Sequence, residues 1–121
     1  MKKQDMEKMV NAGLDPESAI ERFMGNETLY LKFLFRFPDD ENYQNLCRFI
    51  EQQDCENAFT AAHTLKGVCG NLSIKSMESI LREQVEYLRS GDLQQGQKMM
   101  GELKEAYDRI KEVINELKEN S

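Results

Sequence analysis

The chain has 121 residues with 22 acidic and 16 basic side chains, which gives a formal net charge of −6 near pH 7. This length suits one domain, and the negative charge argues against nucleic acid as the main partner. The sequence contains no apolar run of about 18 residues and no secretion signal at its amino terminus, so we expect a cytoplasmic protein without a membrane span.

The first part of the chain is predicted to form two short helices. Apolar residues between positions 6 and 10 mark the first, which we expect to end near Gly13. Asp15 is suited to cap the second helix, and Pro16 is suited to its first position. Glycine and asparagine at 25–26 then predict a turn.

Two more helices are predicted before the centre of the chain. Apolar residues within 30–37 define one of them, and Pro38 should stop it. Asp39 or Asp40 is expected to cap the next helix, whose apolar side lies within 43–50.

The remaining residues predict three longer helices, over about 54–72, 74–90 and 93–118. Asp54 is the expected cap of the first of these, and Ser73 is the expected cap of the second.

Short connections between these helices imply antiparallel neighbours. From Met100 onward the apolar residues follow alternating spacings of three and four, which is typical of packing along a bundle seam. We therefore expect an all-α protein, an antiparallel up-down-up-down four-helix bundle with additional short amino-terminal helices, forming one domain over 1–121.

The helix predicted over 54–72 carries the single histidine of the chain, His63. With His63 set at 0° and about 100° per residue, an arc from about 140° to 240° contains only small or apolar residues. These residues are Ala58, Ala61, Leu65, Val68, Cys69 and Leu72. This arc is the predicted core stripe, and His63 lies opposite its centre.

The outward face of the same helix holds an unusual set of residues within about 60° of the histidine. They are Phe59, Thr60, Lys66, Gly67 and Gly70. A glycine inside a helix costs about 1 kcal/mol relative to alanine, and a glycine used only for helix packing should face the core. We therefore interpret the glycines as space cleared beside a nucleophile, with a positive charge one turn away.

Two residues of this face leave alternatives open. Phe59 either anchors a partner or contacts an amino-terminal helix folded over the face. Asn71, at about 80° from His63, is a weaker candidate for a polar contact at the edge.

The surroundings of the histidine contain no acidic residue from Asn57 to Met77, although the chain as a whole is acidic. Lys66 and Lys75 are the charged residues in this window, apart from any charge on His63. Such a patch would tolerate a phosphoryl group, which carries close to two negative charges near neutral pH. A lone histidine in a helical domain commonly has no role, but these neighbours favour a functional one.

The run HTLKG at 63–67, followed by NL at 71–72, resembles the signature of histidine-containing phosphotransfer (HPt) domains. Residues 19–37 resemble the amino-terminal helices of free-standing bacterial members, and the resemblance covers about 13–91. The chain departs from the family pattern at Ser73, where the family often has glycine, and this departure leaves the local turn open.

The resemblance implies a phosphorelay carrier rather than an enzyme. His63 would take a phosphoryl group from the aspartate of one response-regulator receiver domain and pass it to the aspartate of another. Lys66 would offset the phosphoryl charge, and Gly67 and Gly70 would let the receiver approach.

The resemblance also sets expectations for partners and cofactors. The partners would be receiver domains, with a hybrid sensor histidine kinase as a further candidate, and Phe59, Thr60 and Asn71 would contact them. The protein would need no cofactor or metal of its own, because Mg²⁺ is expected on the receiver. A bacterial monomer fits a carrier that must expose its histidine.

Two rival interpretations remain at this point. A kinase dimerisation domain also places a histidine on a helical hairpin, but an acidic residue commonly follows that histidine, whereas Thr64 follows here. A non-catalytic helical adaptor would keep the fold without carrying phosphate.

Overall fold

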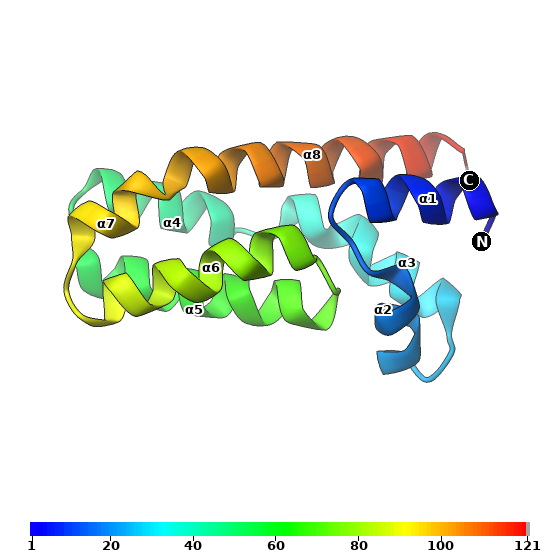
Figure 1. Ribbon diagram of the computed structural model, residues 1–121, viewed down its shortest axis with the longest axis horizontal. Coiled ribbons are helices and arrows are strands. Elements are labelled where there is room, and N and C mark those ends of the chain that lie inside the picture. Colours follow the sequence, from blue (N-terminus) through cyan, green and yellow to red (C-terminus); the bar gives the residue numbers. More distant parts are fainter. Residues whose placement is uncertain (121) are drawn as a thin grey trace.

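The computed structural model describes residues 1–120, and its regular elements are helices (Figure 1). They are α1 Lys3–Asn11, α2 Pro16–Arg22, α3 Glu27–Arg36, the 3₁₀ turn η1 Phe37–Asp39, α4 Asn42–Glu51, α5 Cys55–Asn71, α6 Lys75–Arg89, α7 Leu93–Lys98 and α8 Met100–Glu119. The predicted all-α bundle is confirmed, with α4, α5, α6 and the pair α7–α8 as its helices and α1–α3 as additions.

The arrangement of these helices places α5 beside both α4 and α6, while α8 packs on α6 from the other side (Figure 1). The added helix α1 lies along the carboxyl-terminal half of α8, and Lys8 pairs with Glu116 at 3.8 Å. No helix within residues 1–120 combines the length and the apolar character that crossing a bilayer requires.

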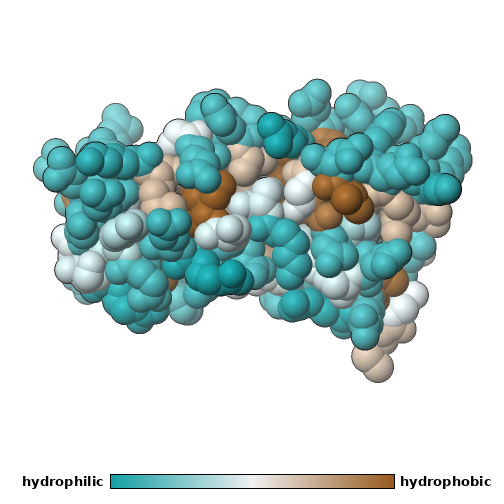
Figure 2. Space-filling view, in the orientation of Figure 1, coloured by the Kyte–Doolittle hydropathy of each residue, from teal (hydrophilic) through white to brown (hydrophobic). Residues whose placement is uncertain are grey.

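The bundle is stabilised by apolar faces that follow the helical repeat. On α8 the buried residues Leu103, Tyr107, Ile110, Ile114 and Leu117 recur every three or four positions. Burying one large apolar side chain contributes about 1.5–3 kcal/mol. The outer surface is mainly hydrophilic, and hydrophobic residues show mostly in the seams between helices (Figure 2).

Side-chain caps start four of the helices, as the sequence predicts for two of them. The carboxylates of Asp15 and Asp54 accept hydrogen bonds from the third backbone amides of α2 and α5, at 3.2 and 3.1 Å. Asn26 and Asp92 do the same for α3 and α7. Each such cap stabilises its helix by about 1 kcal/mol.

The start of α4 differs from the prediction in one residue. The N-cap position belongs to Glu41, which offers no capping side chain. Asp40 nevertheless accepts hydrogen bonds from both the backbone amide and the side-chain amide of Asn42, each at 2.8 Å. The predicted carboxylate therefore serves the first turn from one residue outside the cap position.

Ser73 does not cap α6, so this prediction is wrong. The N-cap residue is Ile74, which makes no side-chain cap, and the Ser73 hydroxyl instead lies 2.7 Å from the Ser18 hydroxyl of α2. Ser73 has a φ of 54°, in the left-handed region that favours glycine. Glycine adopts this conformation most easily, and here serine occupies it.

The third long helix, expected over 93–118, is broken at Met99 into α7 and α8. Gln84 of α6 contacts the chain just before this break, where its Nε2 donates to the Gly96 carbonyl at 2.9 Å. A side chain that takes a helical carbonyl in this way can interrupt the hydrogen-bond ladder. Gly96 also allows Leu88 of α6 to pack closely against this segment, since a Cβ at position 96 would lie 2.7 Å from Leu88 Cδ2.

The added amino-terminal helices are attached to the turn between α5 and α6. Leu14 and Ile74 form an isolated antiparallel bridge, and the Asp15 amide donates to the Ser73 carbonyl at 2.9 Å. The buried Tyr30 hydroxyl donates to the Leu72 carbonyl at 3.1 Å. These contacts fix α2 and α3 beside the carboxyl-terminal end of α5.

Candidate functional site

His63 is the middle residue of the 17-residue helix α5, and its side chain is exposed. The predicted core stripe behind it is largely as expected, because Ala58, Ala61, Leu65 and Cys69 are buried. Ala62, which the stripe did not include, is also fully buried. The core therefore holds the backbone of α5 from behind, and the imidazole points away from it.

Phe59 lies between the histidine and a cation from the neighbouring helix. Its ring centroid is 5.8 Å from that of His63, and the Arg89 guanidinium carbon lies 5.0 Å from the Phe59 ring centroid. Arg89 also pairs with Glu86 at 3.3 Å. Arg89 of α6 therefore covers Phe59, where one of the two alternatives expected an amino-terminal helix.

Arg89 is the residue of this group that sequence reasoning missed. It follows His63 by 26 positions and lies in the last turn of α6. In an antiparallel hairpin the last turn of one helix packs beside the first turn of the other, and the Cys55 thiol to Leu88 carbonyl contact at 3.5 Å shows this pairing. Hairpin register was therefore the signal that could have found it.

Lys66 and Gly67 lie one turn further along α5 from His63. The Lys66 side chain is half-buried and forms no ion pair or hydrogen bond with the described residues 1–120. A Cβ added to Gly67 would meet no atom within 4 Å. The helix therefore presents an unpaired ammonium group beside open space next to the imidazole.

Gly70 is less open than the sequence predicts. A Cβ there would lie 3.2 Å from a carboxylate oxygen of Glu78, and Glu78 pairs with Arg82 at 2.6 Å. The acid-free window ends at Met77. The next residue, Glu78, belongs to the first turn of α6, and this turn places it over the end of α5. The expectation of a carboxylate-free patch is therefore wrong at Gly70, where Arg82 offsets the acidic charge.

The two remaining predicted residues lie at the edges of the face. The Thr60 hydroxyl is exposed and donates to the Glu56 carbonyl of its own helix at 3.3 Å. Asn71 is exposed at the last residue of α5 and lines a pocket together with Val68 and Leu72.

Cys69 is a second nucleophilic side chain on the same part of α5, but it faces the core. Burial raises the pKa of the Cys69 thiol, and the nearby negative charges of Glu78 and Asp40 raise it further. At neutral pH the thiol therefore stays protonated and shielded, whereas the His63 imidazole is accessible.

The fold and this face define a helical bundle whose central helix exposes one histidine beside a lysine and an open glycine. The family model of the Hpt domain matches residues 38–113, which is more than half of the chain, so the protein belongs to the Hpt domain family. Neither the curated proteins nor the solved structures compared with the chain include a significant match.

Membership of this family establishes a general function. Hpt domains take part in phosphotransfer in two-component signalling, where they are carriers rather than enzymes. The family interacts with response-regulator receivers and histidine kinases. Helices α1–α3 precede the matched residues and are additions to the family's core.

The open space at Gly67 makes a testable prediction. Gly67→Gln should slow phosphotransfer from a receiver at least about tenfold, because a side chain would occupy the approach to His63. The free energy of unfolding should stay equal or rise by up to about 1 kcal/mol, since glycine is a poor helix former. Transfer kinetics and urea denaturation measure the two effects.

Gly101→Gln is a matched control for this change. Gly101 also lies in a helix, and a Cβ added to it would meet no atom within 4 Å, but it belongs to α8. The control should gain similar stability and keep the normal rate. A normal transfer rate in Gly67→Gln would contradict the interpretation of Gly67 as cleared space.

Proposed function

We propose that this protein carries a phosphoryl group between the aspartates of two receiver domains as phosphohistidine at His63. The observation that supports the proposal most strongly is the exposed imidazole at the centre of α5, beside the open Gly67 and the unpaired Lys66, in an Hpt domain. A partner domain can reach this face, and the charge of the transferred group would be offset there.

The proposed step is a nucleophilic displacement at phosphorus. An imidazole nitrogen of His63 forms a bond to phosphorus, the bond between phosphorus and the aspartate oxygen breaks, and the aspartate leaves as a carboxylate. The second receiver reverses this chemistry, with its aspartate as nucleophile and the imidazole as leaving group. The receiver would supply Mg²⁺, which neutralises phosphoryl charge, so the carrier itself would use no cofactor.

The proposal extends to the setting of the reaction. We propose a bacterial, cytoplasmic monomer that meets successive receivers and, where the pathway has one, a hybrid sensor histidine kinase. Phe59, packed between Arg89 and His63, would hold the imidazole ring in position.

The experiment mixes the protein with a phosphorylated receiver domain of the same host and Mg²⁺. Label that is acid-labile and alkali-stable on the wild type is the expected result, because this stability pattern is that of phosphohistidine. Absence of label with every receiver of the host would contradict the proposal and favour an adaptor that docks without carrying phosphate.

Lys66→Ala is expected to slow the uptake of label about tenfold without unfolding the protein. The ammonium group would otherwise offset negative charge that builds up during transfer, and its half-exposed position limits the effect relative to a fully buried donor. Rapid-quench kinetics measures the rate, and circular dichroism checks the fold. Lys75→Ala, which removes an exposed lysine at the first residue of α6, is the control and should transfer normally. A wild-type rate in Lys66→Ala would exclude the role of Lys66.

A further inference from the structure

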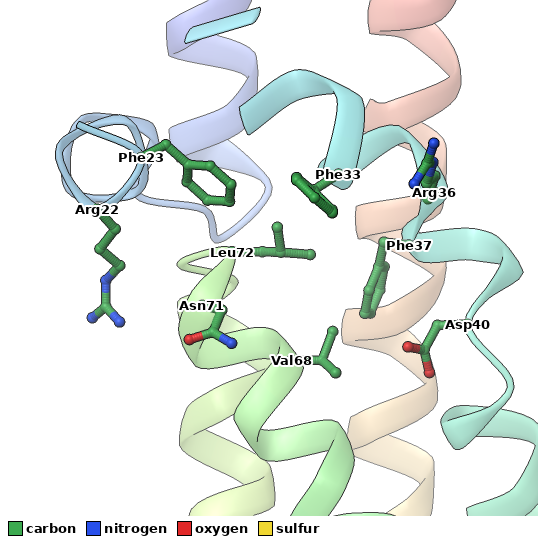
Figure 3. A pocket seen from close by; sticks show the side chains of 9 residues that line it. All are labelled: Arg22, Phe23, Phe33, Arg36, Phe37, Asp40, Val68, Asn71 and Leu72. Carbon is green, nitrogen blue, oxygen red and sulfur yellow. The ribbon is translucent and has the colours of Figure 1, made fainter. Parts of the chain in front are cut away.

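A pocket of about 540 Å³ opens beside the carboxyl-terminal end of α5 (Figure 3). Its interior is apolar, and the side chains that Figure 3 shows converging on it are Phe23, Phe33, Phe37, Val68 and Leu72. Volumes of this order can take up one or two large side chains or a small ligand. We call this cavity the α3–α5 pocket.

One aromatic residue of the pocket, Phe33, is exposed. The Phe33 side chain lines the pocket and is 43% exposed. Its ring packs on that of Phe23, with the two centroids 5.7 Å apart. Exposed apolar surface gathered in a concave site commonly marks a place where another molecule binds.

The position of the pocket connects it with the phosphotransfer face. One wall comes from α2 and α3, which precede the residues matched by the family model, and the other comes from the end of α5. Asn71 belongs to this second wall and lies at about 80° from His63 around the helix. Val68 and Leu72 lie further round the helix, at about 140° and 180°, so a domain docked over His63 reaches the pocket only if it extends past Asn71.

The rim of the pocket is positively charged in a chain of net charge −6. Arg22 and Arg36 line it, and within residues 1–120 neither guanidinium forms an ion pair with a carboxylate. Arg36 lies over the Phe33 ring at 5.8 Å. Asp40, the acidic residue of the rim, already accepts two hydrogen bonds from Asn42. The rim therefore fits an acidic partner surface.

We propose that the α3–α5 pocket receives an apolar side chain of the receiver domain, while carboxylates on either side of that side chain contact Arg22 and Arg36, which lie on opposite sides of the pocket (Figure 3). The inference rests on the proposed function, because a receiver that presents a phosphorylated aspartate to His63 brings an anionic surface to this side of α5. The added helices then select which receivers exchange phosphate with His63, since the matched family core alone forms only half of the pocket.

The test reverses the charge of the rim in the double variant Arg22→Glu/Arg36→Glu. Both side chains are exposed, so the fold should remain intact. With the receiver that transfers fastest to the wild type, we expect the rate constant at low protein concentration to fall at least about tenfold at low salt. The deficit should shrink at high salt, as expected for charges that steer association. Phe33→Ala should also slow transfer, but without this dependence on salt.

The matched control is Lys98→Glu/Arg109→Glu, which makes the same change in net charge on exposed residues of α7 and α8. It should transfer at the wild-type rate. A second measurement labels His63 with phosphoramidate, in which ammonia leaves as the imidazole takes the phosphoryl group and no receiver is needed. All variants should accept this label equally.

The outcomes separate the pocket from the proposed function. Normal transfer from the receiver to the double variant would overturn the pocket inference and leave the function of His63 intact. Loss of phosphoramidate labelling in the double variant would also overturn it, because the defect would then lie at His63. A wild-type dimer that the double substitution dissociates, with transfer unchanged, would assign the pocket to a second copy of the chain. If the wild type took up label from none of the receivers of the host, both proposals would be overturned.

Discussion

His63→Gln is expected to abolish phosphoryl uptake from a receiver while leaving the helical spectrum unchanged. The amide of glutamine is not a nucleophile, so labelling should fall by about 10³-fold or more. Because the His63 side chain is exposed and its neighbours on the core stripe are unaltered, stability should stay within about 0.5 kcal/mol of the wild type. Autoradiography after transfer and circular dichroism measure the two properties.

A control for this substitution is Glu83→Gln, which introduces the same side chain at an exposed position of α6. It should accept label at the normal rate. Persistent acid-labile label in His63→Gln would place the phosphoryl group elsewhere and contradict the role of His63.

Gly13→Ala is the substitution with the largest expected effect on stability. Gly13 has a φ of 98°, and a Cβ there would lie 2.5 Å from both the Cβ and the Oγ of Ser76. The unfavourable φ costs about 1–2 kcal/mol and the overpacking about 1–3 kcal/mol more. The Gly13 carbonyl also accepts the Ser76 amide at 3.0 Å, so the junction cannot move away freely. We expect a loss of about 2–5 kcal/mol in urea denaturation.

Gly25→Ala separates the two causes. Gly25 also has a positive φ, of 79°, but no atom lies within 4 Å of a Cβ placed there. This control should lose only the conformational part, about 1–2 kcal/mol. Equal losses in the two variants would show that the contact between Gly13 and Ser76 does not constrain the junction of the added helices with α6.

Much of the fold could be predicted because its signals are local. A carboxylate at a helix start reaches a free backbone amide three residues on without help from distant parts of the chain, which is why Asp15 and Asp54 could be identified as caps. The apolar spacing likewise marked the buried side of α8. The break at Met99 could not be predicted from this spacing, and the contact that Gln84 makes just before it comes from another helix.

The candidate site shows the same division between local and distant information. The angular positions on one helix placed His63 outward, with Gly67 in open space beside it. Glu78 over Gly70 and Arg89 over Phe59 come from α6, and only the hairpin register brings them to α5. The α3–α5 pocket needs contacts between segments about 30 to 50 residues apart, and no periodicity in the sequence encodes them.

The most direct test of the proposed relay is a pulse and chase through His63. The protein is labelled from a phosphorylated receiver, freed of that receiver, and mixed with a second, unlabelled receiver and Mg²⁺. We predict that label leaves His63 and appears on the aspartate of the second receiver at the same rate. Label that stays on the protein, or that is released only as inorganic phosphate with every receiver of the host, would contradict the account of this protein as a carrier between receivers.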